Sequence, residues 1–297
     1  MTLVDAARPP RLEVARAYVG LTKPRIIELL LVTTVPAMVV AAGGFPDPWL
    51  VAATLLGGAL AAGSANTFNS YLEADIDEVM ERTSRRPLPT HRVPPQKALM
   101  FGFVLGVAAC AWLVVAVNVL AAVLATAAIL FYVFVYTLAL KRRSEQNLGI
   151  GGAAGCVPVL VGWAAVTGEV GLPAVLMFAI VFYWTPPHFW ALALKCRDDY
   201  ARAGVPMLPV VRGPQETARQ ILLYAVVMVA VTLMFGALAG MGTLYLVAAL
   251  ALGGVFLLLA LQLRRDPGEQ QAMRLFRYSI TYLGLLFVAM AADAIIS

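Results

Sequence analysis

Three oxygen-bearing side chains recur every fourth residue at the polar end of a long apolar run. Asn69, Glu73 and Asp77 would share one face of a helix at this spacing. Amide and carboxylate oxygens suit Mg²⁺, which commonly joins one or two carboxylates to the phosphates of a substrate. The spacing therefore predicts a metal–diphosphate site. The alternative is a solvated loop in which acids and bases pair with one another.

Other charged residues extend this prediction. Basic side chains after the first cluster would bind phosphate oxygens that the metal leaves free, and a second acidic cluster occurs later in the chain. The Lys141-Arg142 pair either binds the diphosphate or only marks one face of a membrane. The residues added to the candidate site are Arg82, Arg86, Lys141, Arg142, Lys195, Asp198 and Asp199.

These residues lie in a chain that is suited to a lipid environment. Its mean hydropathy is +0.82 and its hydrophobic content is 61%, which excludes an ordinary water-soluble domain. A helix needs about 20 apolar residues to cross a bilayer. The sequence predicts an all-α bundle of nine membrane helices, with spans at 26–44, 49–72, 99–117, 119–140, 148–167, 171–194, 220–240, 243–263 and 276–296.

The basic residues predict the orientation of this bundle. They gather in the N-terminal tail and in the connections on one side of the predicted membrane, which places the N-terminus in the cytoplasm and the C-terminus outside. The net charge of +5 then reflects basic residues on the cytoplasmic face, where anionic lipids and substrates could bind. Nucleic acid is not expected as a partner. Residues 12–20 are expected to form a short helix on the membrane surface.

A short pattern occurs twice and indicates an internal duplication. The sequence L-P-x-x-R-x-P-x-x-x-A is found at 88–98 and again at 208–218, each time after an acidic cluster. We therefore predict one domain over 1–297, with a tail over 1–25, four-helix pseudo-repeats at about 26–140 and 148–263, and a last helix at 276–296. Membrane proteins built from such repeats commonly bind substrate between the two halves.

Several stretches resemble a known family. Asn69-x-x-x-Glu73-x-x-x-Asp77 resembles the first signature of the UbiA-type intramembrane prenyltransferases. Within that superfamily the chain is most similar to the haem-farnesylating family, the protohaem IX farnesyltransferases. The stretches that carry this likeness are Leu21-Thr-Lys-Pro-Arg25, Glu73-Ala-Asp-Ile-Asp77, Gly151-Gly-Ala-Ala-Gly155, Gly162-Trp-Ala-Ala-Val-Thr-Gly168, Trp184-Thr-Pro-Pro-His-Phe-Trp190 and Ala203-Gly-Val-Pro-Met-Leu-Pro-Val210.

The resemblance implies transfer of a farnesyl group from farnesyl diphosphate to the 2-vinyl group of haem B, with addition of water. The products would be haem O and pyrophosphate, and Mg²⁺ would be the cofactor. It also implies membrane lipids as surroundings, the bacterial inner membrane as location and a haem A synthase downstream. Two residues depart from the superfamily pattern, because Glu73 and Lys195 stand where Asp is expected. Lys195 is expected to bind the diphosphate and to replace part of a second metal's charge.

His188 is the other candidate, and the resemblance assigns it to haem together with Trp184 and Trp190. A polar residue inside a membrane span is a functional candidate, and neutral imidazole is a ligand of haem iron. The alternative is a histidine that bonds a helix carbonyl freed by Pro186-Pro187. Two other functions stay open, namely prenylation of an aromatic quinone precursor and secondary transport of an anionic or amphipathic solute.

Overall fold

The computed structural model describes residues 11–296, apart from the side chains of residue 11 and residues 25–31, and the predicted positions 1–10 of the tail lie outside it. All regular secondary structure in the described residues is helical, and they contain no strand. Its N-terminal part comprises α1 (Arg11–Thr22), α2 (Pro24–Ala42), α3 (Pro48–Leu72), α4 (Ala74–Val79), α5 (Pro95–Ala116), α6 (Val119–Leu130) and the π-helical η1 (Phe131–Leu140).

The C-terminal part repeats the alternation of long and short helices. It comprises α7 (Asn147–Gly151), the 3₁₀ segment η2 (Gly152–Cys156), α8 (Val157–Thr167), α9 (Leu172–Lys195), α10 (Arg197–Arg202), α11 (Leu208–Val211), α12 (Gly213–Leu238), α13 (Thr243–Arg265) and α14 (Glu269–Ile296). Short α4 follows α3 as short α10 follows α9, and the duplication stays a prediction.

The predicted membrane bundle is confirmed. In the described part of the chain, eight helical segments are long and apolar enough to cross a membrane, and α2 occupies the place of the first predicted span. Two helices begin seven residues earlier than hydropathy predicts, α12 at Gly213 and α14 at Glu269 instead of 220 and 276. Hydropathy marks where the hydrocarbon ends, whereas a helix can continue into water as long as its backbone hydrogen bonds persist.

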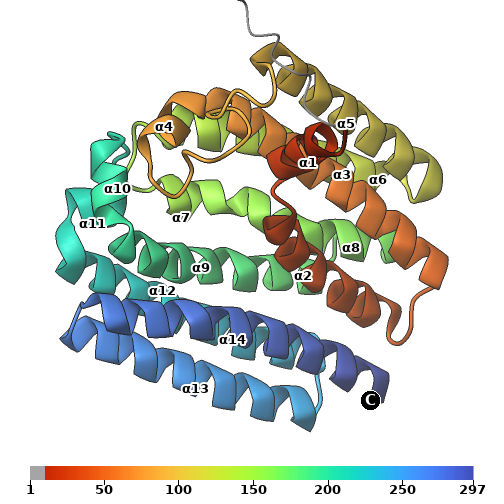
Figure 1. Cartoon of the computed structure of the whole chain (residues 1–297). Coiled ribbons are helices and arrows are strands. Elements are labelled where there is room, and N and C mark those ends of the chain that lie inside the picture. The colour runs from red at the N-terminus through yellow and green to blue at the C-terminus, as the bar shows by residue number, and fades with distance from the viewer. Residues whose placement is uncertain (1–10, 297) are drawn as a thin grey trace, which may run out of the picture.

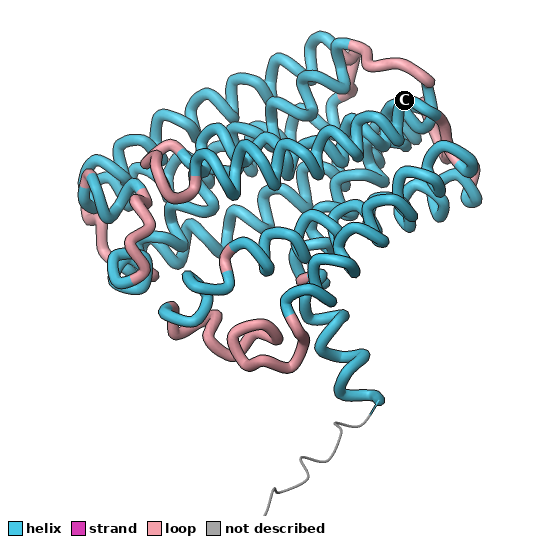
Figure 2. Tube along the Cα trace, turned by 90° about the horizontal axis from the view of Figure 1, so that it is seen from above, coloured by secondary structure: helices cyan, strands magenta, loops and turns pink. Residues whose placement is uncertain are grey.

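The long helices run side by side, with α5 and α13 at opposite edges in Figure 1 and the connecting loops at the two ends of the bundle in Figure 2. The last helix, α14, contacts α13, α9 and also α2, so it joins the C-terminal helices to the start of the first half. Large apolar side chains such as Phe103, Phe134 and Val247 face outward, as expected for a surface in contact with lipid.

Helix α9 is continuous through Pro186 and Pro187. Its residues are largely buried between α8, α12 and α14. Proline is tolerated inside a membrane helix where neighbouring helices and polar side chains hold the backbone, and here the Thr185 hydroxyl donates to the Val181 carbonyl at 2.8 Å. The unbroken helix carries Trp184, Thr185 and His188 at fixed positions relative to one another.

Polar side chains fix the starts of two helices. Asn118 accepts a hydrogen bond from Ala121 N at the start of α6, and its amide donates to the Ala164 carbonyl of α8 at 2.7 Å. Asp293 near the end of α14 is 3% exposed and accepts from Gly242 N and Tyr245 N at the start of α13. Each of these side chains therefore caps one helix and also ties two helices together.

Candidate active site between the helices

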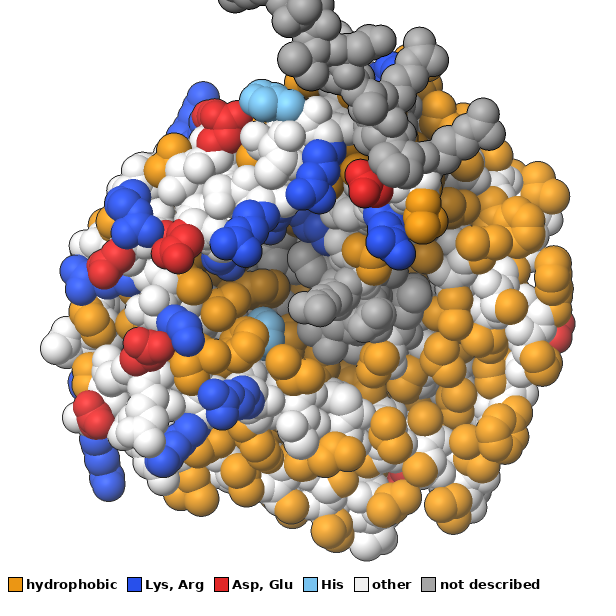
Figure 3. Space-filling model, in the orientation of Figure 1, with side chains coloured by type: hydrophobic (Ala, Val, Ile, Leu, Met, Phe, Trp, Pro, Cys, Tyr) orange, Lys and Arg blue, Asp and Glu red, His pale blue; other side chains and the backbone are white. Residues whose placement is uncertain are grey.

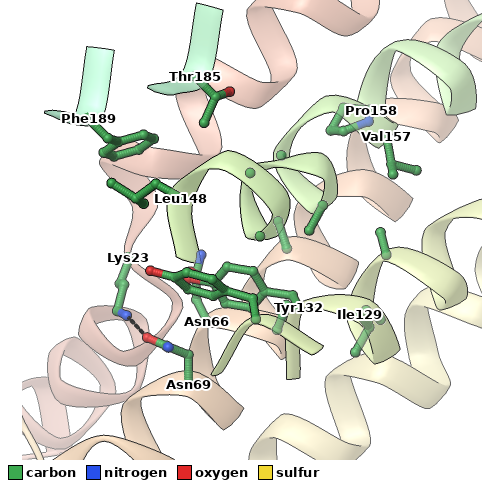
Figure 4. Close-up of a pocket in the computed structure, with 18 of the residues that line it drawn as sticks. Lys23, Asn66, Asn69, Ile129, Tyr132, Leu148, Val157, Pro158, Thr185 and Phe189 are labelled. Atoms are coloured by element: carbon green, nitrogen blue, oxygen red, sulfur yellow. Dashed lines mark hydrogen bonds between the residues drawn. The ribbon is translucent and has the colours of Figure 1, made fainter. Parts of the chain in front are cut away.

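A cavity of about 310 Å³ lies inside the bundle, and its lining changes from ionic to apolar along its length. The lining comes from α2, α3, α4, the loop after α4, α6, η1, α7, η2, α8, α9 and α10, with Lys23 before α2, Lys141 after η1 and Leu283 of α14. Figure 4 shows Lys23 and Asn69 at one end, Ile129, Val157 and Pro158 toward the other, and Tyr132 between them. The apolar part is lined by small residues, including Ala61, Ala62, Ala65, Ala125, Ala128 and Ala154.

The three predicted metal ligands lie together at the ionic end. Although α3 ends at Leu72, helical hydrogen bonds continue from Glu73 N to the Asn69 carbonyl (3.0 Å) and from Asp77 N to the Glu73 carbonyl (2.8 Å). The spacing of four residues therefore places all three side chains on one face, and each lines the cavity. They are 1–2% exposed.

Each of these side chains is paired with a different cation. Lys23 Nζ lies 2.5 Å from Asn69 Oδ1, and Lys141 Nζ lies 2.5 Å from Glu73 Oε2. Arg86 Nη1 donates to both carboxylate oxygens of Asp77 at 2.9 and 2.8 Å. Buried carboxylates are tolerated only when they are paired, and these cations meet that requirement.

Lys23 belongs to the site although the sequence reasoning did not assign it there. It precedes α2 in a left-handed backbone conformation with φ of 54°, an unusual geometry for a residue other than glycine. Loss of water around the ammonium, together with the nearby Arg86 charge, lowers the pKa of Lys23 to about 7. The sequence signal for Lys23 was its position immediately before a predicted span, on the face that carries the basic residues. Its contact with Asn69 could not be predicted, because the two residues are far apart in sequence.

The ionic end fits a divalent cation. Glu73 Oε1 is buried and has no hydrogen-bond partner among the described residues, which leaves one carboxylate oxygen available for a ligand. The Asn69 amide donates to the Thr137 hydroxyl at 3.2 Å, so that its carbonyl oxygen faces Lys23. No group of three or more His, Cys, Asp or Glu side chains suited to a metal is present in the described part of the chain, so Asn69 would supply the third protein ligand.

Arg82 also lines the cavity, and its side chain is bound by Tyr200 from the second half of the chain. Its Nη2 donates to the Tyr200 hydroxyl at 2.5 Å, and its guanidinium carbon lies 5.0 Å from the centre of the Tyr200 ring. Tyr200 is buried and lines the cavity as well.

The remaining predicted diphosphate residues lie away from the cavity lining. Lys195 is half exposed and pairs with Glu269 at 3.3 Å, whereas Arg142 forms two hydrogen bonds with Asp75 at 2.7 and 2.8 Å. Asp198 is exposed, and Asp199 pairs with Arg202 on the same short helix. In Figure 3 the charged side chains gather on the side of the molecule where α4, α10 and α11 lie.

His188 lies where α9 meets α14, one helical turn from the cavity-lining Trp184. Its Nδ1 is 2.7 Å from the Ser279 hydroxyl, and its ring stacks on Trp184 and Phe276 with centroid distances of 4.4 and 4.6 Å. The Ser279 hydroxyl donates to the Phe276 carbonyl at 2.6 Å. It therefore accepts from Nδ1–H, and Nε2 of the neutral ring carries the lone pair. The alternative bond to a freed helix carbonyl is not what the structure shows.

The two tryptophans beside His188 differ. Trp184 lines the cavity and donates from Nε1 to the Ser279 carbonyl at 2.8 Å. Trp190 is fully buried and packs edge-on against Tyr224, and its Nε1 has no partner among the described residues. Of these two tryptophans, Trp184 is therefore the one that connects His188 to the cavity, and the cavity-lining Phe189 also packs edge-on against His188 with a centroid distance of 4.9 Å.

Comparison with known proteins decides the family. The sequence pattern described as "UbiA prenyltransferase family" matches residues 30–289. The chain belongs to the UbiA prenyltransferase family. Among curated UbiA proteins, it is 56% identical to "Protoheme IX farnesyltransferase 1" of Saccharopolyspora erythraea, over 97% of this chain and 93% of the relative. It is 55% identical to "Protoheme IX farnesyltransferase" of Clavibacter michiganensis subsp. michiganensis, over 95% and 93%.

Solved structures share the UbiA fold. A structure described as digeranylgeranylglyceryl phosphate synthase matches with a TM-score of 0.80 at 17% identity, covering 96% of this chain and all of that one. A UbiA homolog from Archaeoglobus fulgidus, described as bound to DMAPP and Mg²⁺, matches with a TM-score of 0.65 at 16% identity over 94% and 98%. The chain is thus a membrane-embedded prenyltransferase, and its cavity is the candidate active site of a UbiA enzyme.

Proposed function

We propose that this UbiA prenyltransferase transfers the farnesyl group of farnesyl diphosphate to the 2-vinyl group of haem B, with addition of water, to form haem O and pyrophosphate. The observation that carries the proposal is the close similarity, at 56% identity over almost the whole chain, to a protein named protoheme IX farnesyltransferase. The cavity supports it, because one end suits a diphosphate and the other a prenyl chain.

The diphosphate would bind at the ionic end. Asn69, Glu73 and Asp77 would hold Mg²⁺, which would neutralise charge on the departing pyrophosphate. Arg86 and Lys141, which now pair with the two carboxylates, would bind phosphate oxygens once the metal neutralises those carboxylates. Lys23, which contacts Asn69, would also bind a phosphate oxygen.

The farnesyl chain would extend along α3 into the small-residue part of the cavity. From Asn69 to Ala61 the helix rises about 12 Å, at 1.5 Å per residue. Alanine side chains at 61, 62 and 65 leave room for a branched hydrocarbon on this face. The apolar lining would also exclude water from the reacting carbon until the acceptor is bound.

The chemical step would occur between these two parts. The bond between farnesyl C1 and the diphosphate oxygen breaks, and C1 forms a bond to the terminal carbon of the haem vinyl group. The positive charge passes to the vinyl carbon beside the porphyrin, where water adds and a proton leaves. Tyr132 and Tyr136 line this part of the cavity with ring centres 5.1 Å apart, and their π faces would stabilise the allylic cation.

The haem would approach from the side of α9 and α14. Trp184 lines the cavity and stacks on His188, so a porphyrin held by His188 would lie next to the cavity. We assign the Nε2 atom of His188 to the haem iron, because Nδ1 is already bonded to Ser279.

The membrane orientation belongs to the same proposal. The charge distribution favours an orientation with the diphosphate site on the cytoplasmic side. The family resemblance is the basis for proposing a bacterial inner membrane and a haem A synthase that consumes the product. A reporter fused after residue 297 should be active outside the cytoplasm, and one inserted near Arg143 should be active inside. The opposite pattern would contradict the orientation.

The decisive experiment is incubation of the purified protein with haem B, farnesyl diphosphate and Mg²⁺, followed by mass analysis of the haem. Haem O is expected, and it should be lost on chelation and in Asp77→Asn. The loss of one electrostatic contact of this kind costs about 10²-fold or more in rate. Conversion of 4-hydroxybenzoate, with haem B left unchanged, would contradict the proposed acceptor.

A further inference from the structure

The second acidic cluster presents a tyrosine to the cavity instead of its carboxylates. Asp198 and Tyr200 are two residues apart on α10, which places them about 200° apart around a helix at 100° per residue. When Tyr200 faces the cavity, Asp198 must therefore face away, and its side chain is exposed. Asp199 is paired with Arg202 on its own helix.

Tyr200 and Arg82 form a contact between the two halves of the chain at the ionic end. The Tyr200 hydroxyl accepts from Arg82 Nη2 at 2.5 Å, and both side chains line the cavity. Tyr200 itself is fixed, because it is 8% exposed and its carbonyl accepts from Val205 N at 3.0 Å. Arg82 lies in the loop after α4 and is exposed, so it depends on this bond for a defined position.

The charges at this end favour one divalent cation. The first cluster supplies two carboxylates and an amide, whereas the described side chains of the second half place no acid in the cavity lining. A guanidinium has five N–H donors, so Arg82 retains free donors for phosphate after one nitrogen bonds Tyr200.

We propose that Tyr200 is a positioning residue that holds Arg82 over the diphosphate, where Arg82 takes the place of a second divalent cation. The inference rests on the proposed diphosphate substrate. The second half of the chain then contributes to diphosphate binding through the Tyr200 phenol, which positions Arg82 of the first half. The site would hold one metal ion per chain.

Metal counting provides the first test. The full chain in detergent is equilibrated with Mn²⁺ and farnesyl S-thiolodiphosphate, a substrate analogue that ionises poorly, and bound Mn²⁺ is counted by electron paramagnetic resonance. One Mn²⁺ per chain is expected, both in the wild type and in the Asp198→Asn/Asp199→Asn variant. Two Mn²⁺ per chain in the wild type, or a lower count in that variant, would overturn the inference.

A double-mutant cycle provides the second test. Tyr200→Phe removes only the hydroxyl and should weaken binding of the analogue by about tenfold. In an Arg82→Ala background the same change should have an effect of less than about twofold, because Tyr200 acts through Arg82. Tyr183→Phe, which removes a phenol outside the cavity lining, is the matched control and should leave the affinity unchanged. Equal losses in both backgrounds would show that Tyr200 does not act through Arg82.

The tests separate this inference from the proposed acceptor. Affinity for the analogue and the Mn²⁺ count are measured without haem. If the cycle behaves as expected but haem B is not converted, the acceptor is wrong and the Tyr200–Arg82 contact stands. If haem O forms but Tyr200→Phe binds the analogue normally, the inference fails and the proposed function stands.

Discussion

Lys141 Nζ lies 2.5 Å from Glu73 Oε2, and the two side chains are 15% and 2% exposed. The ammonium comes from the end of η1 and the carboxylate from the end of α3, so this ion pair joins two helices at the ionic end of the cavity. A carboxylate this deeply buried requires a partner. The pair therefore holds the two helices together, and we propose that Lys141 also supplies a cation for the diphosphate.

Lys141→Met should destabilise the protein, because it leaves the Glu73 carboxylate buried and unpaired. Breaking such a pair costs about 3 kcal/mol. Adding Glu73→Gln should restore most of the thermal stability in detergent, because a neutral amide then replaces the unpaired carboxylate. Haem O formation should stay lost in the double variant, and a double variant as unstable as Lys141→Met would contradict the proposed pairing.

Diphosphate binding should take up a proton at Lys23. With a pKa lowered to about 7, the Lys23 amine is mostly neutral at pH 8, and a bound diphosphate raises that pKa by favouring the ammonium. Binding at pH 8 should therefore be accompanied by proton uptake, and uptake should fade as the pH is lowered below 7. Calorimetry in buffers of different ionisation enthalpy measures it. Lys23→Arg, which stays charged, should lower the uptake by up to one proton, and equal uptake in both proteins would exclude Lys23.

His188→Phe should separate the packing role of the histidine from its role toward haem. The phenyl ring keeps the stacking on Trp184 and Phe276 but removes both nitrogens. We expect a shifted Soret band and weaker haem binding, with unchanged affinity for the farnesyl diphosphate analogue. An unaltered haem spectrum would leave His188 as a structural contact between α9 and α14.

Asp293→Ala should destabilise the fold without touching the cavity. The carboxylate accepts from Gly242 N and Tyr245 N at the start of α13, and loss of such a cap costs about 1–2 kcal/mol. Thermal unfolding in detergent should show the decrease. Glu169→Ala removes an exposed carboxylate from a loop and should leave the stability unchanged.

Much of the architecture could be predicted from local patterns. The membrane spans follow from runs of apolar residues, because each run must satisfy its own backbone hydrogen bonds in lipid. The shared face of Asn69, Glu73 and Asp77 follows from helical periodicity alone. The three side chains keep this face beyond the end of α3, because helical hydrogen bonds continue to Asp77. The length of α12 and α14 could not be predicted in this way, because helix continues beyond the hydrocarbon.

The sequence by itself thus determined a membrane helix bundle and the shared helical face of Asn69, Glu73 and Asp77. Only the tertiary structure decided which cations pair with these three side chains. It also decided which of the two acidic clusters has carboxylates in the cavity lining. Lys23 meets Asn69 and Arg82 meets Tyr200 across 46 and 118 residues of chain. Such contacts depend on how the helices pack and rotate about their axes, and a rotation of one residue on α10 is enough to exchange a carboxylate for a phenol at the cavity.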